Sequence, residues 1–163
     1  MNLKPSSQTY LYGHKILFNE LVDINNKNKL PNKILLSGEK GVGKSTFAYH
    51  FINWIHSADE TNSYDLDNFK INSENKSFLL TQNKSNPNFE LIDVDEDKKK
   101  IDINQIRNLI LKLNKSSFNN NQRFVLIDNI EFLNSNSINA LLKVLEEPND
   151  NTYFILINNN KNV

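Results

Sequence analysis

A glycine-rich stretch at residues 38–45, Gly-Glu-Lys-Gly-Val-Gly-Lys-Ser, constrains this chain more than any other feature. It fits G-x-x-x-x-G-K-[ST], the pattern of a phosphate-binding loop. The apolar run at 34–36 predicts a buried strand before the loop, and the residues after it have helical spacing. An ordinary glycine-rich turn between strand and helix is the alternative. Because three of only 4 glycines lie in this loop, the phosphate-binding interpretation is favoured.

The loop has the chemistry of a nucleotide site. Glycines allow successive backbone N–H groups to point at phosphate oxygens, and the following helix adds its positive N-terminal end. Lys44 would neutralise the β- and γ-phosphates, and the Ser45 hydroxyl would hold Mg²⁺. The expected nucleotide-binding residues of the loop are Gly38, Glu39, Lys40, Gly41, Val42, Gly43, Lys44, Ser45 and Thr46.

The composition of the chain excludes several kinds of protein. The 163 residues suit one domain, and 38% hydrophobic residues allow a packed core. A formal net charge of zero gives no global basic field of the kind that marks a nucleic-acid binder. With no cysteine, disulfides and cysteine-ligated zinc are excluded. No signal peptide or membrane-length apolar run is present, so we expect a cytoplasmic protein without a membrane partner.

Strand and helix patterns alternate along the chain. Strands are predicted at 34–36, 89–94, 123–128 and 152–157, with helices at 16–28, from 44, from 102 and from 135 or 137. The apolar stripes of the last three helices are Phe47, Ala48, Phe51, Trp54 and Ile55; Ile103, Ile106, Leu109, Ile110 and Leu113; and Ile138, Leu141, Leu142 and Leu145. This order predicts an α/β fold whose mainly parallel sheet is covered on both faces, with ligands at the carboxyl ends of its strands.

Several local features have simple interpretations. Asp102 and Gln105 have the spacing of a helix-capping box, and Ser135 or Ser137 is expected to cap the next helix. His50 and His56 lack metal-ligand spacing and are interpreted as surface histidines. The stretch 95–100 is interpreted as a solvated loop, since its acidic and basic triplets cancel. Asn119, Asn120 and Asn121 are expected in a loop.

The long polar segment 57–88 is the least informative part of the chain. Its anchors are Tyr64, Leu66, Phe69, Ile71 and the run 78–80, and it is expected to contain short helices or a mobile loop. A loop of this length in a compact domain is usually functional or an insertion.

The second half of the nucleotide site is expected at the end of the predicted strand 123–128. Four apolar positions followed by Asp128 form the pattern of a Walker B strand, so Asp128 would reach the Mg²⁺ that Ser45 holds. A loop-capping aspartate is the alternative. Asn129 follows, and an amide cannot act as a general base. Glu131 is expected to cap or pair rather than catalyse.

The run 139–148, Asn-Ala-Leu-Leu-Lys-Val-Leu-Glu-Glu-Pro, together with 123–128 and 152–157, resembles the bacterial clamp-loader ATPase family of DNA polymerase III. The delta-prime branch of this family is the better match and the gamma/tau branch is next. Gly13-His14, Leu30-Pro31, the segment 85–88 and the segment 103–107 also resemble delta-prime. The resemblance implies a P-loop NTPase of the AAA+ type, a three-layer α/β sandwich over residues 1–163.

The resemblance also implies a role in DNA replication. Family members bind ATP in a five-subunit ring that opens the sliding clamp and places it on primed DNA. The implied partners are other clamp-loader subunits and the sliding clamp, with DNA reached only through the assembled complex. The backbone around Tyr12 and Gly13 would lie near the adenine, and Asn158 or Asn159 near the family's sensor position.

The chain departs from the family in three ways. The segment 57–88 lacks the four-cysteine zinc module that many members have there. AAA+ ATPases usually have Glu where this chain has Asn129, so ATP and Mg²⁺ binding is expected with little hydrolysis. The last strand, the helical lid and the arginine motif are expected beyond residue 163, so the domain is interpreted as incomplete. A nucleotide-driven switch, a non-hydrolysing stator and an unrelated phosphate-loop kinase are the competing hypotheses.

Overall fold

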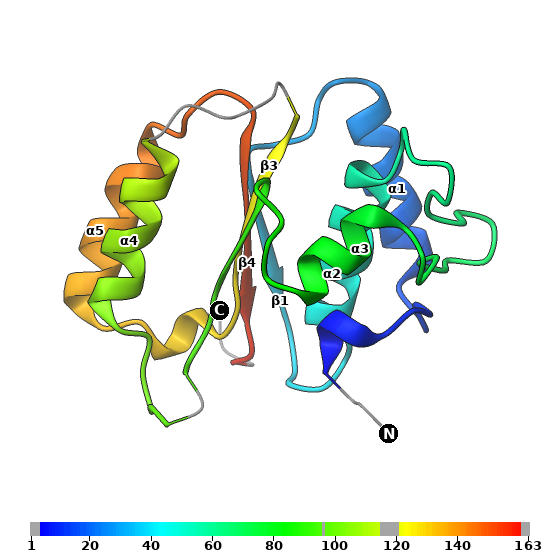
Figure 1. The fold of residues 1–163 in the computed structure, drawn as a ribbon. Helices are drawn as coiled ribbons and strands as arrows, with labels where there is room; N and C mark the ends of the chain where they lie inside the picture. The colour runs from blue at the N-terminus through cyan, green and yellow to red at the C-terminus, as the bar shows by residue number, and fades with distance from the viewer. Residues whose placement is uncertain (1–3, 96, 115–120, 161–163) are drawn as a thin grey trace. The chain divides into compact units, whose positions relative to one another are not determined.

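The computed structural model describes residues 4–95, 97–114 and 121–160 (Figure 1). The chain divides into two compact units. Of the described residues, 4–31 and 43–86 form a helical unit, and 32–42, 87–95, 97–114 and 121–160 form a sheet unit. Each unit is described separately below.

The sheet unit is built on four parallel strands. They are β1 (Lys33–Ser37), β2 (Phe89–Ile92), β3 (Arg123–Ile127) and β4 (Thr152–Asn158), in the order β1-β4-β3-β2. The predicted parallel sheet and its four strands are therefore confirmed. Ser37 pairs with Asn158, and Ile127 pairs with both Ile92 and Leu156. Because all strands run the same way, the residues that follow them gather at one edge of the sheet.

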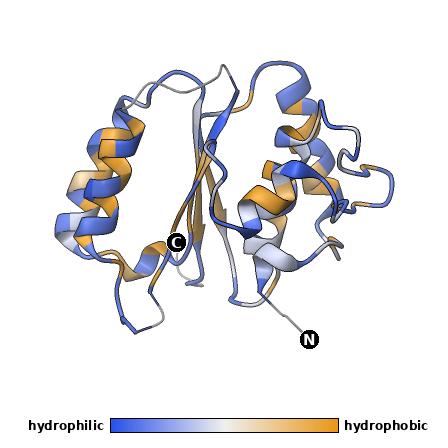
Figure 2. Cartoon of the chain, in the orientation of Figure 1, coloured by the Kyte–Doolittle hydropathy of each residue, from blue (hydrophilic) through white to orange (hydrophobic). Residues whose placement is uncertain are grey.

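Two helices cover one face of this sheet, α4 (Ile103–Leu113) and α5 (Ser135–Glu146), and they lie side by side in Figure 1. A short 3₁₀ turn, η2 (Ile130–Phe132), follows β3. Figure 2 shows hydrophobic residues along the strands and within both helices. The core between the sheet and these two helices contains Ile92, Ile101, Ile106, Leu109, Leu113, Val125, Ile127, Leu141 and Phe154.

Helix α4 begins as its sequence predicts. The Asp102 side chain accepts a hydrogen bond from the Asn104 backbone N–H at 2.8 Å, and the Gln105 side chain accepts from the Asp102 N–H at 3.2 Å. This reciprocal arrangement is a capping box. The Asp102–Asn104 bond is the main reason that the pKa of Asp102 lies below its usual value.

Helix α5 differs from its sequence prediction in two respects. Its N-cap is Asn134, whose side chain accepts from the Ser137 N–H at 2.8 Å, and neither Ser135 nor Ser137 is the cap. An Asn side chain at the preceding position already satisfies that N–H, so the helix starts one residue earlier.

The buried stripe of α5 is also narrower than predicted. Leu141 is only 4% exposed, whereas Ile138 and Leu142 are 41% and 46% exposed. The buried positions are Ser137 and Leu141, with Val144 and Leu145 partly buried. Since each residue advances a helix by about 100°, Ile138 and Leu142 are rotated away from the line through Ser137 and Leu141.

The helical unit contains η1 (Pro5–Ser7), α1 (Lys15–Asn26), α2 (Lys44–His56) and α3 (Lys76–Gln82). Its centre is aromatic, since the fully buried Phe18 ring lies 5.6–5.9 Å from four other rings. These are Phe47, Phe51, Tyr64 and Phe69. The segment 57–88 thus contributes two core aromatics and one short helix, as its apolar anchors suggested.

His50 contradicts the prediction of a surface histidine. The side chain is 0% exposed, with Nδ1 2.9 Å from the Tyr64 hydroxyl and Nε2 3.1 Å from the Gln8 carbonyl oxygen. Burial lowers the pKa of His50 to about 4, although the Gln8 carbonyl opposes the shift. A neutral imidazole with both ring nitrogens in contact with polar atoms is compatible with a buried position. His56 is partly buried.

Asn53 and Asn75 hold α3 on α2. Their side-chain amides exchange two hydrogen bonds of 3.1 Å, and the Asn75 oxygen also caps α3 by accepting from the Phe78 N–H at 2.6 Å. The Glu60 carboxylate accepts from the Lys76 and Ser77 N–H groups at the same helix end. In residues 4–95, 97–114 and 121–160, no helix combines the length and apolar character that crossing a membrane requires.

Candidate nucleotide site

The glycine loop joins β1 directly to α2. Strand β1 ends at Ser37 and α2 begins at Lys44, so the predicted order of strand, turn and helix is confirmed. Gly38, Gly41 and Gly43 have φ angles of 148°, 89° and 92°. Such angles are strained for residues with a Cβ atom, which is why this path of the backbone requires glycine.

The start of α2 is a helix N-terminus of the type at which proteins bind anions. Its first intrahelical hydrogen bond runs from the Phe47 N–H to the Gly43 carbonyl at 2.8 Å. Residues 44–46 therefore form the first turn of α2, at the positive end of the helix. Lys44 is buried and Ser45 and Thr46 are partly buried, whereas Glu39, Lys40 and Val42 are exposed.

Asp128 lies at the carboxyl edge of the sheet, directly after β3. Its backbone N–H donates to the Ile92 carbonyl at 2.9 Å, and its Oδ1 accepts from the Asn129 N–H at 2.8 Å. The residue is 9% exposed. A buried carboxylate and a serine hydroxyl are hard oxygen ligands of the type that Mg²⁺ prefers.

No group of three His, Asp or Glu side chains that could hold a metal occurs in the described part of the chain. A Mg²⁺ ion that arrives with nucleotide phosphates needs only one or two protein oxygens, so the residue types at Ser45 and Asp128 fit such an ion.

Asn129 lies between two polar side chains from the neighbouring strands. Its Nδ2 donates to Asp93 Oδ1 at 2.7 Å, and its Oδ1 accepts from Asn159 Nδ2 at 2.8 Å. Asp93 follows β2 and Asn159 follows β4. These three residues, which we name the edge network, cross the carboxyl ends of three adjacent strands.

Asp93 is a site residue that the sequence did not predict. The alternating run 89–94 indicates a strand that includes Asp93, whereas β2 ends at Ile92. The signal was an acid that follows an apolar strand, the same signal that pointed to Asp128. Only the strand order β4-β3-β2 reveals that Asp93 lies beside Asn129.

The remaining predicted positions have distinct surroundings. Asn158 ends β4, and its side chain accepts from the Asn160 N–H at 3.0 Å, so Asn159 rather than Asn158 contacts Asn129. Glu131 accepts from the Asn159 N–H at 3.3 Å, in agreement with its expected pairing role. Tyr12 is highly exposed and stacks on Tyr10 at 6.3 Å.

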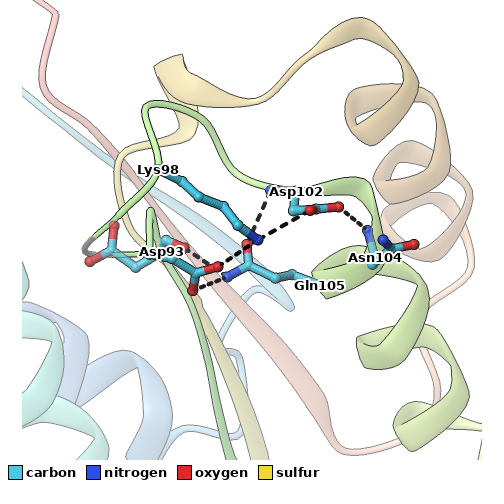
Figure 3. A network of polar contacts seen from close by, with 6 residues as sticks. Asp93, Lys98, Asp102, Asn104 and Gln105 are labelled. Atoms are coloured by element: carbon cyan, nitrogen blue, oxygen red, sulfur yellow. Dashed lines mark hydrogen bonds and ion pairs between the residues drawn. The ribbon is translucent and has the colours of Figure 1, made fainter.

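A second polar cluster adjoins Asp93 (Figure 3). The Gln105 amide nitrogen donates to the Asp93 carbonyl oxygen at 3.1 Å and to Asp95 Oδ1 at 2.8 Å. The Lys98 ammonium lies 3.0 Å from Asp95 and 3.2 Å from Asp102. These two hydrogen-bonded carboxylates raise the pKa of Lys98. Asp95 and Lys98 pair while both side chains stay about half exposed, in agreement with the predicted solvated loop.

Strand order, parallel pairing and the glycine loop after β1 define an α/β fold that is consistent with the P-loop type. A similar fold occurs in the crystal structure of a DNA polymerase III gamma subunit-related protein from Thermotoga maritima. That match has a TM-score of 0.51 and 18% identity, and it covers 85% of this chain and 38% of the other. At this identity the match supports the fold alone.

Sequence relatives define the family. Residues 13–163 match the family model described as DNA polymerase III, delta subunit. The chain therefore belongs to the DNA polymerase III delta subunit family.

Two curated relatives illustrate the extent of the similarity. The chain is 29% identical to the DNA polymerase III subunit delta' of Buchnera aphidicola subsp. Baizongia pistaciae, over 97% of this chain and 45% of that protein. It is also 29% identical to the subunit gamma/tau of Mycoplasma genitalium, over 93% of this chain and 24% of that protein. The chain thus spans less than half the length of these relatives.

Proposed function

We propose that this chain is the nucleotide-binding part of a clamp-loader subunit of DNA polymerase III. In this proposal it acts in DNA replication, together with other clamp-loader subunits and the sliding clamp, and it contacts DNA only within the assembled complex. Binding of Mg-ATP changes its conformation and thereby helps to load the clamp. Family membership supports the assignment to this complex.

The observation that carries the ATP-binding role is the geometry of the glycine loop. Three glycines with positive φ lead into a helix whose first residues are Lys44 and Ser45. Phosphate-binding loops of this type direct backbone N–H groups at their ligand, and the residue types here supply one cation and one hydroxyl. In the proposed site, residues 38–46 bind the phosphates, and Ser45 and Asp128 bind Mg²⁺. Tyr12, Gly13 and Asn158 remain proposed contacts.

Two features support binding without rapid hydrolysis. Asn129 has an amide where a general base needs a basic oxygen. In addition, both ends of that amide are engaged, by Asp93 and by Asn159. These bonds are also the observation that favours the second candidate, a stator whose nucleotide site is idle.

Calorimetric titration of Mg-ATP into the chain and into Lys44→Ala separates these candidates. If the loop binds phosphate, wild type binds Mg-ATP and Lys44→Ala loses at least about tenfold in affinity, since one charge-assisted contact to phosphate is removed. Lys29→Ala is the matched control, because Lys29 is an exposed lysine of the same unit outside the loop.

Each of the three possible results supports or contradicts a different hypothesis. Loss of binding in Lys44→Ala but not in Lys29→Ala supports the nucleotide switch. Absence of binding to a folded wild-type chain contradicts the switch and favours the stator. Equal binding to wild type and Lys44→Ala contradicts the assignment of the loop.

A further inference from the structure

Residues 69–71, which we name the brace, hold the segment that leads into the turn 12–14. Two backbone hydrogen bonds join the brace to residues 9–11 in an antiparallel arrangement. They run from the Ile71 N–H to the Thr9 carbonyl at 2.8 Å and from the Leu11 N–H to the Phe69 carbonyl at 3.0 Å. The long polar segment 57–88 therefore contacts the residues just before the turn.

The brace contains a residue in an unusual backbone conformation. Phe69 has a φ angle of 50°, which is uncommon for a bulky side chain. Its buried ring lies 5.6 Å from the Phe18 ring, and the Lys15 ammonium lies 4.9 Å from its centre. Since such a backbone conformation persists only where the surrounding contacts fix it, the aromatic core of the helical unit holds the brace in place.

Side chains continue the connection from the brace to Tyr12. The Lys70 ammonium lies 4.9 Å from the centre of the Tyr10 ring, which is a cation–π contact. The Tyr10 ring in turn stacks on the Tyr12 ring, with their centres 6.3 Å apart and their planes inclined by 30°. Tyr12 is 83% exposed, so much of its ring is open to solvent. Lys70 and Tyr10 thus limit the orientation of an exposed aromatic ring.

The turn 12–14 also lies close to the start of α2. The His14 and Phe47 rings meet edge to face, with their centres 6.2 Å apart. Phe47 belongs to the first turn of α2, because its N–H donates to the Gly43 carbonyl at 2.8 Å. The exposed Tyr12 ring is therefore two residues from a side chain that contacts the helix end where nucleotide phosphates are proposed to bind.

We propose that the brace, through Lys70 and Tyr10, positions the Tyr12 ring as a stacking surface for the base of the nucleotide. This inference rests on the proposed ATP-binding function and gives the segment 57–88 a part in it. An aromatic ring stacks on the face of a base without needing a matched donor or acceptor. Lys70 and Tyr10 are positioning residues, because they act on the base only through Tyr12.

The first test compares the affinities for Mg-ATP and for Mg-tripolyphosphate, which has three phosphates but no base or ribose. In wild type, ATP should bind more tightly than tripolyphosphate. Tyr12→Ala should lower the ratio of ATP to tripolyphosphate affinity by about fivefold or more, because stacking on the base is lost. The exposure of Tyr12 makes this variant suitable, since truncating an exposed side chain has little effect on folding.

Lys70→Ala tests the positioning role. It should lower the same ratio by about twofold to fivefold, since one cation–π contact is lost. Lys70→Arg keeps a cation beside the Tyr10 ring and should restore the wild-type ratio. Combined with Tyr12→Ala, Lys70→Ala should have no further effect on the ratio. Lys29→Ala is the matched control, because it removes an exposed lysine of the same unit outside the brace.

The second test monitors the Tyr12 ring directly through the NMR signals of its ring protons. In wild type these signals should shift when saturating Mg-ATP is added and stay in place with saturating Mg-tripolyphosphate. The shift with Mg-ATP should be smaller in Lys70→Ala and unchanged in Lys29→Ala. Because the nucleotide is saturating, this comparison measures the geometry of the ring and not the affinity of the site.

The outcomes distinguish this inference from the proposed function. Equal affinity ratios in wild type and Tyr12→Ala overturn the stacking of the base and leave the phosphate site standing. The role of the brace is overturned if Lys70→Ala leaves the ratio unchanged, or if it still lowers the ratio in the absence of the Tyr12 ring. A folded wild-type chain that binds neither ligand overturns both proposals.

Discussion

The side-chain nitrogen of Asn129 lies 2.7 Å from Asp93 Oδ1, so the residue directly after Asp128 donates a hydrogen bond to a carboxylate from the next strand. An amide suits this position because it has a donor, which a carboxylate lacks when ionised. The neighbouring strand therefore determines which residue types are tolerated after Asp128.

Replacing Asn129 alone by Glu should not produce an efficient ATPase. The new carboxylate faces Asp93, and two like charges at this distance should lower the free energy of unfolding by about 1 kcal/mol. The pair Asn129→Glu with Asp93→Asn restores a donor opposite the carboxylate. If the loop binds ATP, we expect phosphate release by the double variant to exceed that of Asn129→Glu by about tenfold or more, since the carboxylate is then available as a base.

Phosphate release and urea denaturation of both variants test this prediction. Adding Lys44→Ala to the double variant should abolish the gain and serves as the control for turnover in the glycine loop. Equal stability and equal turnover of the single and double variants would show that Asp93 has no influence on residue 129.

Leu141 and Leu142 form a matched pair on α5. Leu141→Ala should lower the free energy of unfolding by about 2–5 kcal/mol, because it leaves a cavity in the core beneath the helix. Leu142→Ala should lower it by less than about 0.5 kcal/mol, since its side chain is already 46% exposed. Chemical denaturation of the two variants measures both values. Similar losses would mean that Leu142 is covered in solution.

The cap of α5 offers a second matched pair. Asn134→Ala removes the acceptor of the Ser137 N–H and should cost about 1 kcal/mol of stability. Ser135→Ala changes an exposed residue within the first turn and should have a much smaller effect. Thermal denaturation distinguishes them. A larger loss of stability in Ser135→Ala than in Asn134→Ala would show that Ser135 is the N-cap, as the sequence predicts.

Burial of His50 predicts a stability that falls with decreasing pH. The folded pKa is about 4 against an ordinary value of 6.5, so the unfolded chain binds the proton more readily between these values. Stability contributed by neutral His50 is therefore complete above about pH 6.5 and is lost progressively as the pH falls toward 4. Between pH 7 and pH 5 the loss should be about 2 kcal/mol.

Urea denaturation at pH 7 and pH 5 measures this dependence, and His50→Gln is the control because glutamine does not titrate. The difference between wild type and His50→Gln should shrink by about 2 kcal/mol on acidification. A constant difference across this range would show that the imidazole is not held neutral by burial.

Local signals predicted much of the fold. The glycine loop, the capping box at Asp102 and Gln105, and four apolar strands appear where their patterns placed them. These features depend on interactions over a few residues, and such interactions are readable from spacing. The stripe of α5 was predicted too wide, because periodicity identifies an apolar face without showing how much of it a neighbouring helix covers.

The sequence by itself determined the strand-loop-helix unit around Lys44 and the acid that follows β3, because glycine is the residue that most readily adopts positive φ angles and apolar runs favour burial. Tertiary structure alone decided the surroundings of His50 and the contact between Asp93 and Asn129. His50 lies 14 residues from Tyr64, and Asp93 lies 36 residues from Asn129. Packing of the aromatic core and the strand order β4-β3-β2 bring these pairs together, and neither is encoded in local spacing.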